Sequence, residues 1–213
     1  MKKLVFRLFC VLVLIASCAA RTKPETEYLV NEMNVPLWWS DLPIRVYFDS
    51  STMTTDQIVL SRTAFEIWNS ALGEDVFNVH PNWVETTHNL TLAADGHETL
   101  VVRMEHIPAR FRNIQKLGYC QYHFRQNRLG DSASIHSVDI VLHDELEWQD
   151  VMFITLHEAG HALGLMHDPR KSSIMFRMPL GGGMEIEDRD IDYIQMQIAL
   201  MRMQQNGYRA AYQ

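Results

Sequence analysis

The alternation of apolar and polar residues predicts a chain that combines several strands with a few long helices. Short runs rich in branched and aromatic residues predict strands, because such residues suit a pleated, half-buried surface. The clearest runs lie at residues 43–48, 76–79, 99–104, 117–124 and 138–143. A segment with the helical period interrupts this series after residue 48, and others follow residue 143.

The segment from Thr54 to about residue 72 has the pattern of an amphipathic helix. Thr54 and Gln57 form a capping box, in which each side chain bonds the backbone N–H of the other residue. Apolar residues then recur every two turns, which predicts a buried face. A final helix is predicted from about residue 188 to 203, where one apolar stripe consists of Ile191, Ile194 and Ile198. The stripe favours core packing, although a partner helix could also bind it.

The first residues have the pattern of an export signal. Three basic residues precede an apolar run from about residue 8 to 16, which is too short to span a bilayer permanently. The run ends in Ile15-Ala16-Ser17-Cys18, which resembles the bacterial lipobox, where the signal is cut before a cysteine that carries lipid. Cys18 is therefore a candidate lipidation site. We expect a bacterial membrane-anchored lipoprotein on the periplasmic or cell-surface face, with plain secretion as the alternative.

Length and composition favour one folded domain. We divide the chain into a signal peptide at 1–17, a polar tether at 18–35, one domain at 36–205 and a tail at 206–213. No second long apolar segment is present. Cys120 is the only cysteine of the folded part, so no disulfide is available within it.

The charge of the chain argues against a nucleic-acid partner. The formal net charge is −7, and loss of the three basic residues of the signal changes it to −10. Such an acidic chain is repelled by phosphate backbones and by anionic lipid headgroups.

The most informative stretch runs from His157 to Asp168 and reads H-E-A-G-H-A-L-G-L-M-H-D. On a helix, His157 and His161 project from one face and can hold one zinc ion. Glu158 lies beside the metal, which suits a base for a zinc-activated water. Gly164 tolerates a positive φ, so the chain can turn and bring His167 back as the third ligand. Three ligands leave the fourth tetrahedral position open, as a catalytic zinc requires.

These residues resemble those of the metzincin metalloproteases, and most closely the matrixin branch. Ser173-Ile174-Met175-Phe176 resembles the Met-turn, which would place Met175 beneath the zinc ligands. The A-F-x-x-W pattern at 64–68 and the I-x-x-I-Q pattern at 191–195 resemble the first and last helices of matrixins. Asp168 differs from the serine that is usual in matrixins and resembles the adamalysin branch.

The resemblance covers about residues 42–204 and implies an α+β fold. This is a twisted, mostly parallel sheet with an antiparallel edge strand, an active-site helix and a C-terminal helix. It also implies a zinc-dependent endopeptidase, in which Glu158 is the general base, Gly164 and Asp168 support the turn, and one catalytic zinc is bound. The contrasting hypothesis is a non-catalytic, zinc-containing binding lipoprotein, against which the retained Glu158 argues.

The resemblance further implies how substrate binds. A protein or peptide would pair in extended form with an edge strand near Leu117, Gly118, Tyr119 and Cys120. Residues Phe176 to Pro179 would line a side-chain pocket. We expect a monomer. The role of Cys120, calcium binding, the control of activity and the cleavage preference stay open.

Many matrixins carry a second, structural zinc, but its edge-strand histidine has no counterpart here, because Tyr119 or Cys120 occupies that place. We therefore predict a single zinc. Seven further histidines are expected at the surface or in loops: His80, His88, His97, His106, His123, His136 and His143.

Overall fold

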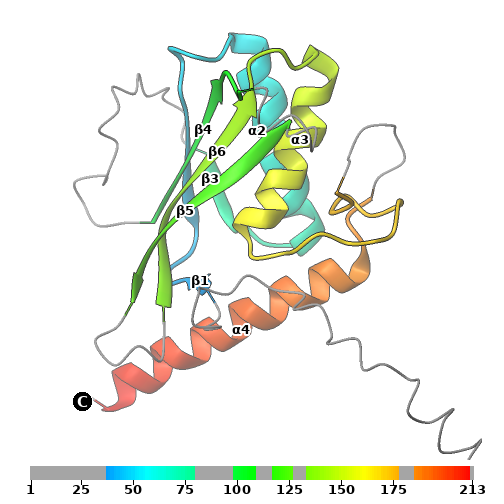
Figure 1. The fold of residues 1–213 in the computed structure, drawn as a ribbon. Coiled ribbons are helices and arrows are strands. Elements are labelled where there is room, and N and C mark those ends of the chain that lie inside the picture. The colour runs from blue at the N-terminus through cyan, green and yellow to red at the C-terminus, as the bar shows by residue number, and fades with distance from the viewer. Residues whose placement is uncertain (1–36, 80–97, 109–116, 127–132, 178–184, 212–213) are drawn as a thin grey trace, which may run out of the picture.

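The computed structural model of the chain describes residues 37–79, 98–108, 117–126, 133–177 and 185–211 (Figure 1). In chain order the elements are β1 (Leu37–Trp39), β2 (Ile44–Phe48), α2 (Thr55–Leu72), β3 (Phe77–Val79), β4 (Thr99–Glu105), β5 (Gly118–Gln126), β6 (Ala133–His143), α3 (Trp148–Ala162) and α4 (Asp188–Ala211). Cys18, Pro179 and the proposed signal and tether lie outside the described residues.

The strands form one sheet in which β6 is central. β4 pairs in parallel with residues 137–143 of β6, and β1 pairs in parallel with residues 133–135. β5 runs antiparallel along the opposite edge of β6, while β2 and β3 continue the parallel part beyond β4. The predicted fold class is thus confirmed: a mostly parallel sheet with one antiparallel edge strand.

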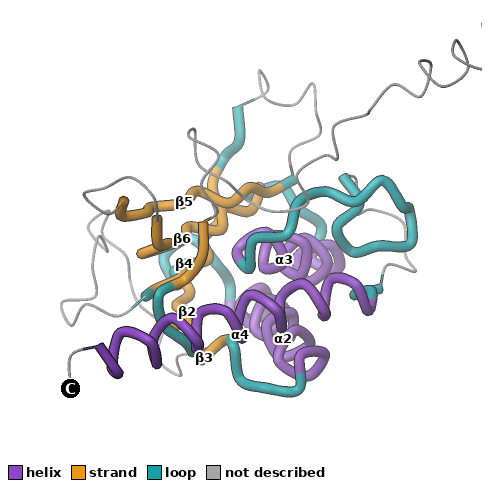
Figure 2. The backbone as a smooth tube through the Cα atoms, turned by 90° about the horizontal axis from the view of Figure 1, so that it is seen from below, coloured by secondary structure: helices purple, strands orange, loops and turns teal. Residues whose placement is uncertain are grey.

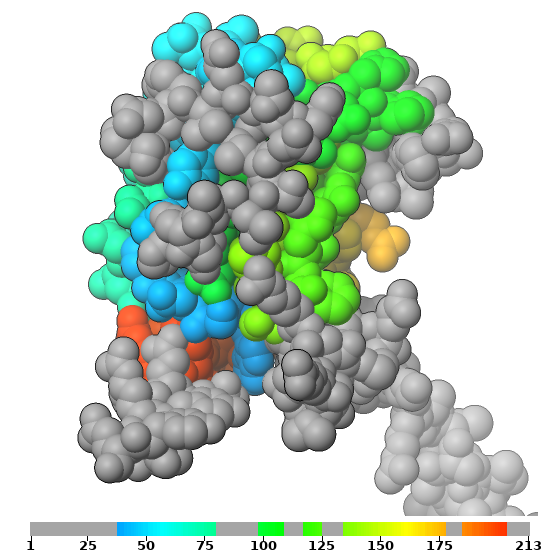
Figure 3. Space-filling view, turned by 90° about the vertical axis from the view of Figure 1, so that its left-hand side faces the viewer, coloured from blue at the N-terminus to red at the C-terminus, as the bar shows by residue number. Residues whose placement is uncertain are grey.

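The helices form a layer on one face of the sheet. Figure 1 shows α2 and α3 side by side against the strands, and α4 crossing below them near β1. The view from below in Figure 2 shows the same layering, with the strands on one side, α2 and α3 on the other, and α4 running across both. In the space-filling view of Figure 3, strand residues form most of the described part of the opposite face, with α4 beneath them.

Helix α2 begins and ends as its sequence predicts. The Thr54 side chain accepts from the N–H of Gln57 and the Gln57 side chain accepts from the N–H of Thr54, so the capping box is present. Gly73 ends the helix with a φ of 71°, a conformation that glycine adopts without strain.

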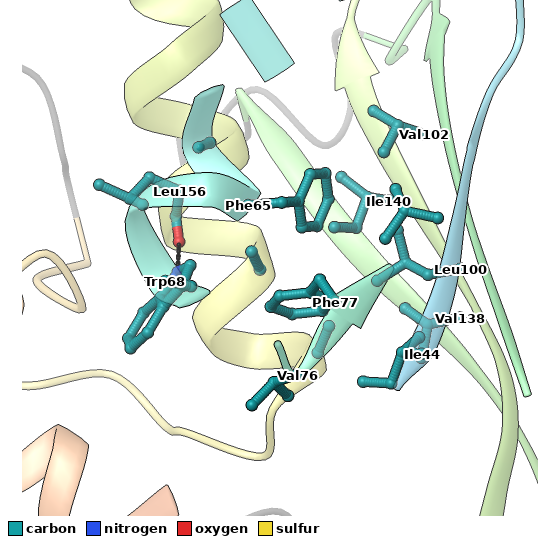
Figure 4. Close-up of a cluster of buried hydrophobic side chains, with 14 of the residues drawn as sticks. Ile44, Phe65, Trp68, Val76, Phe77, Leu100, Val102, Val138, Ile140 and Leu156 are labelled. Atoms are coloured by element: carbon teal, nitrogen blue, oxygen red, sulfur yellow. Dashed lines mark hydrogen bonds between the residues drawn. The ribbon is translucent and has the colours of Figure 1, made fainter. Parts of the chain in front are cut away.

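The core lies between this helical layer and the sheet (Figure 4). Phe65 of α2 packs edge-on against Phe48 and Phe77 of the sheet. Trp68 is fully buried, and its indole N–H donates to the carbonyl oxygen of Leu156 in α3 at 2.9 Å. Because truncating a buried aromatic residue costs about 3–5 kcal/mol, this contact holds α3 firmly in place.

Two elements are longer than their patterns predict, and one was missed. β6 begins at Ala133 rather than near residue 138, and β1 was not predicted at all. The early part of β6 is extended because it pairs with β1 on one edge and β5 on the other, which a local pattern does not encode. α4 continues to Ala211 rather than ending near residue 203, since no proline stops it.

None of the helices in the described ranges combines the length and the apolar character needed to cross a bilayer.

Candidate metal centre

Two histidines of α3 are oriented by backbone carbonyl groups. Nδ1 of His157 lies 2.7 Å from the carbonyl oxygen of Ile174, and Nδ1 of His161 lies 2.7 Å from that of Leu165. A carbonyl oxygen only accepts, so each Nδ1 must carry the proton and donate. The lone pair of each ring therefore remains on Nε2, which is the tautomer a metal ligand requires.

The third histidine reaches the first two through a turn at Gly164. Gly164 has a φ of 92°, in the region that favours glycine, and the chain reverses there after α3. Nε2 of His167 comes to 3.3 Å from Nε2 of His161, and one ligand atom from each of the three histidines lies within 4.8 Å of the others. Two imidazoles on one tetrahedral zinc, at the usual Zn–N distance, have nitrogens about 3.4 Å apart. The predicted ligand set thus fits a zinc ion.

Burial keeps these rings neutral. Desolvation lowers the pKa of His157 from 6.5 to about 4, and the hydrogen bond to Ile174 opposes only part of that effect. Desolvation, with the neighbouring His157, lowers the pKa of His161 to about 3. Burial also lowers the pKa of His167, although its ring is the most exposed of the three. At neutral pH a metal therefore does not have to displace protons from these nitrogens.

Met175 lies beneath the two histidines of the helix. Its side chain is fully buried, and it lies against Gly160, between His157 and His161 in α3. A Cβ atom on Gly160 would collide with the Sδ of Met175 and approach Trp68 Cζ2 at 3.0 Å. Sequence reasoning did not single out Gly160, whose absent side chain makes room for the predicted Met-turn.

The edge strand β5 approaches α3 most closely at Gly118. A Cβ on Gly118 would lie 2.9 Å from Ile154 Cγ2 and 3.2 Å from the Oε1 of Glu158. Glu158 as a residue is 5% exposed, and the contact at Gly118 places its carboxyl group between the helix and this strand. Gly118, predicted as a substrate-binding residue, is also the residue that lets Glu158 fit there.

Replacing Gly118 by Ala is expected to lower kcat/KM by about 10- to 100-fold, because it crowds the Glu158 carboxylate away from its position. Overpacking at this contact should also cost about 1–3 kcal/mol of stability. Gly73→Ala is a matched control, since Gly73 has a positive φ but open space around it and lies at the end of α2. Steady-state kinetics and thermal unfolding of both variants would test this. If Gly73→Ala loses as much activity as Gly118→Ala for the same loss of stability, Gly118→Ala has no specific effect on Glu158.

Two further side chains fasten β5 to α3. The Cys120 thiol donates to the carbonyl oxygen of Glu158 at 3.1 Å, and the Tyr122 hydroxyl donates to that of His161 at 2.9 Å. Burial raises the pKa of both groups well above their usual values, with the charge of Glu158 adding to it. Sequence reasoning missed Tyr122, although the two-residue period of a strand places it on the same face as Gly118 and Cys120.

The remaining predicted residues lie around this strand and the Met-turn. Leu117 packs against the core, and its carbonyl oxygen accepts from the N–H of His143 at 2.9 Å. Tyr119 lies on the face of β5 opposite to Cys120, where burial raises its pKa. Phe176 is partly buried directly after Met175, while Pro179 lies outside the described residues.

A second group of metal-binding side chains consists of His106, His143 and Asp144. The sequence predicts both histidines at the surface or in loops, which is wrong for His143, because it is 6% exposed and is the last residue of β6. Its Nδ1 accepts from the N–H of Glu145 at 3.0 Å and lies 3.1 Å from Asp144. A metal could use this nitrogen only by displacing the backbone hydrogen bond from Glu145, so the second group is the poorer metal site. His80, His88 and His97 lie outside the described residues.

The chain matches a known protein family over the segment that holds this centre. Residues 49–197 match the family model for matrixin, the peptidase family M10. No curated protein sequence matches the chain. Among solved structures, the chain is similar to metalloproteinase-II from Bacteroides fragilis, with a TM-score of 0.45 and 10% identity over 84% of this chain and 67% of that one.

The family match extends from the end of β2 into α4 and includes the three histidines, Glu158 and the Met-turn. It therefore covers the whole candidate metal centre and more than half of the chain. The protein belongs to the matrixin family and is a zinc metallopeptidase.

Proposed function

We propose that the protein is an endopeptidase that hydrolyses extended polypeptide substrates, with His157, His161 and His167 as zinc ligands and Glu158 as the general base. The observation that carries this proposal is the position of Glu158. Glu158 is buried, follows the proposed ligand His157 directly in α3, and brings its carboxyl group close to the edge strand β5 at Gly118.

His157, His161 and His167 would hold a zinc ion, which would supply Lewis acidity and lower the pKa of water to near neutral. Glu158 accepts a proton as the water oxygen attacks the peptide carbonyl carbon. It then delivers this proton to the leaving nitrogen as the C–N bond breaks. The second proton of the water also passes to the leaving nitrogen, so the products are a carboxylate and an ammonium group, and no covalent bond to Ser or Cys is needed.

The outer edge of β5 is the proposed place for substrate. Within the described ranges, β5 pairs with β6 alone, so its other edge leaves main-chain groups for an added strand. The side chains of Cys120 and Tyr122 point to α3, and Gly118 has none, so this edge would recognise substrate mainly through backbone groups. Phe176 and Pro179 are the proposed lining of the side-chain pocket. Specificity would then depend on the pocket more than on β5.

The alternative function is a zinc-containing binding lipoprotein without turnover. A chain under no selection for hydrolysis would not need a carboxyl group beside the metal ligands, and this chain keeps Glu158 there. We further propose that Cys18 carries the lipid anchor and that the domain acts as an exported monomer at a bacterial membrane.

Metal analysis of the purified protein is expected to give one zinc per chain, and a chelator should abolish cleavage of a peptide library. Zinc should be lost on replacing His157, His161 or His167 by Ala, because each variant leaves only two ligands. His123→Ala, on β5 outside the cluster, is the control and should retain the metal. Two tightly held zincs, one of them lost in His143→Ala, would contradict the single-site prediction. Zinc binding without cleavage of any peptide would favour the binding lipoprotein.

A further inference from the structure

The third zinc ligand is held differently from the other two. His157 and His161 are fixed by carbonyl groups on Nδ1, but within the described residues Nδ1 of His167 has no such partner. The His167 ring is also exposed. Its position must therefore depend on the backbone of the loop that carries it, and so on the residue that follows it, Asp168.

Asp168 is fastened to the Met-turn through its backbone. Its N–H donates to the carbonyl oxygen of Met175 at 2.8 Å, and it forms a bridge with Phe176. Its side chain is only 1% exposed, which is unusual for a carboxylate. Burying a charge has a large free-energy cost unless it is paired and hydrogen-bonded, so the partners of this carboxylate decide whether the loop keeps its shape.

Two arginines supply those partners. Arg170, in the same loop, donates from its backbone N–H to Oδ1 at 2.8 Å and from its guanidinium to Oδ2 at 2.9 Å. Arg189 lies in the first turn of α4, and its guanidinium contacts Oδ2 as well. The loop that carries His167 is thereby tied to a helix that begins about twenty residues later in the sequence.

The arrangement continues into the start of α4. Arg170 also pairs with Glu187, whose carboxylate accepts from the Ser172 hydroxyl at 3.0 Å. The Arg189 guanidinium lies 3.8 Å from the carboxylate of Asp190, which is buried. Both sides of the Asp168 carboxylate are therefore held by groups that are themselves restrained, which limits its movement.

Resting on the proposed function, we propose that Arg189 is a positioning residue for the zinc ligand His167, acting through the carboxylate of Asp168. Arg189 touches neither the metal nor the substrate. It neutralises a buried charge at the residue next to the ligand, so that the loop and the imidazole keep one orientation. Helix α4 is thus part of the support of the metal centre as well as of the core.

The test compares Arg189→Met with Arg202→Met. Methionine keeps most of the apolar stem and removes the charge. Arg202 lies on the same helix and pairs with Glu74 at 2.5 Å, away from the metal centre, so it is a matched control. We expect Arg189→Met to release zinc to a chelating dye about 10- to 100-fold faster than wild type, as for other residues that orient ligands. Its kcat should fall with little change in KM, whereas Arg202→Met should behave as wild type. Arg189→Lys should restore part of the zinc retention.

A double-substitution cycle shows whether the effect passes through Asp168. Asp168→Asn should release zinc at least as fast as Arg189→Met, because it affects both arginines, and adding Arg189→Met to it should change the rate no further. If the two substitutions accelerate zinc release by factors that multiply in the double variant, Arg189 does not act through Asp168, and the proposal is overturned. If Arg189→Met releases zinc at the wild-type rate, Arg189 forms only a surface ion pair and does not position His167. A wild type that holds zinc but cleaves no peptide would refute the endopeptidase while leaving this inference testable by zinc release alone.

Discussion

Replacing Glu158 by Gln is expected to lower kcat at least about 10²- to 10⁴-fold while leaving the zinc content unchanged. Gln has the shape of Glu but cannot take a proton from water, so the variant loses the general base and little else. Glu158 is beside the ligands rather than among them, and the substitution removes neither a ligand nor core volume. Thermal stability should therefore change little. Peptide hydrolysis, metal analysis and thermal unfolding of the variant would measure the three quantities.

Glu147→Gln makes the same chemical change at the exposed start of the same helix and is the matched control. It should keep near wild-type activity. A Glu158→Gln protein that still cleaves at the wild-type rate would refute the mechanism. One that loses its zinc would show that Glu158 is a ligand or orients one.

Metal-free protein is expected to lose about 4 kcal/mol of stability between pH 7 and pH 5. The folded-state pKa values of His157 and His161 are about 4 and about 3, below the value of 6.5 for an exposed histidine. The unfolded chain therefore binds protons as the pH falls below 6.5, while the folded chain does not. Each histidine lowers the free energy of unfolding by about 2 kcal/mol over this range, and the loss ends once the pH passes the folded values.

Thermal unfolding of chelator-treated protein at the two pH values would measure this loss, which corresponds to about 10 °C in Tm for a domain of this size. A His157→Gln, His161→Gln double variant is the control and should show a much flatter dependence on pH. Bound zinc should also weaken the dependence of stability on pH, because a bound metal keeps the imidazoles unprotonated. The same steep slope in the double variant would assign the acid sensitivity to other groups.

Local chemistry explains which parts of the fold could be predicted from the sequence. The capping box at Thr54 and the turn at Gly164 each depend on a few neighbouring residues and were predicted correctly. The spacing of His157 and His161 is also local, since the helical period alone puts both on one face. His167 was predicted from the turn at Gly164, whereas Met175 needed the family resemblance, because its return to the helix depends on a loop whose path has no period.

What could not be predicted depends on contacts between distant segments. β1 is only three residues long and is held by pairing with β6, which follows almost a hundred residues later. Arg189 reads as an ordinary surface residue of α4, and only the folded chain brings it to Asp168. Gly160 was not predicted at all, and Gly118 was predicted only as part of the substrate edge, because the packing role of each glycine is the space that a side chain would fill.

The burial of Met175 determines how the protein should respond to oxidants. The chain has twelve methionines, and in the described part Met166, Met196 and Met203 are 41%, 50% and 69% exposed. Peroxide reaches such thioethers first and converts them to sulfoxides, which are polar but harmless on a surface. Met175 is closed off by Gly160 and Trp68, where a sulfoxide oxygen has no room. The exposed methionines are therefore expected to be oxidised before Met175, and oxidation of Met175 is expected only when the chain around Gly160 opens.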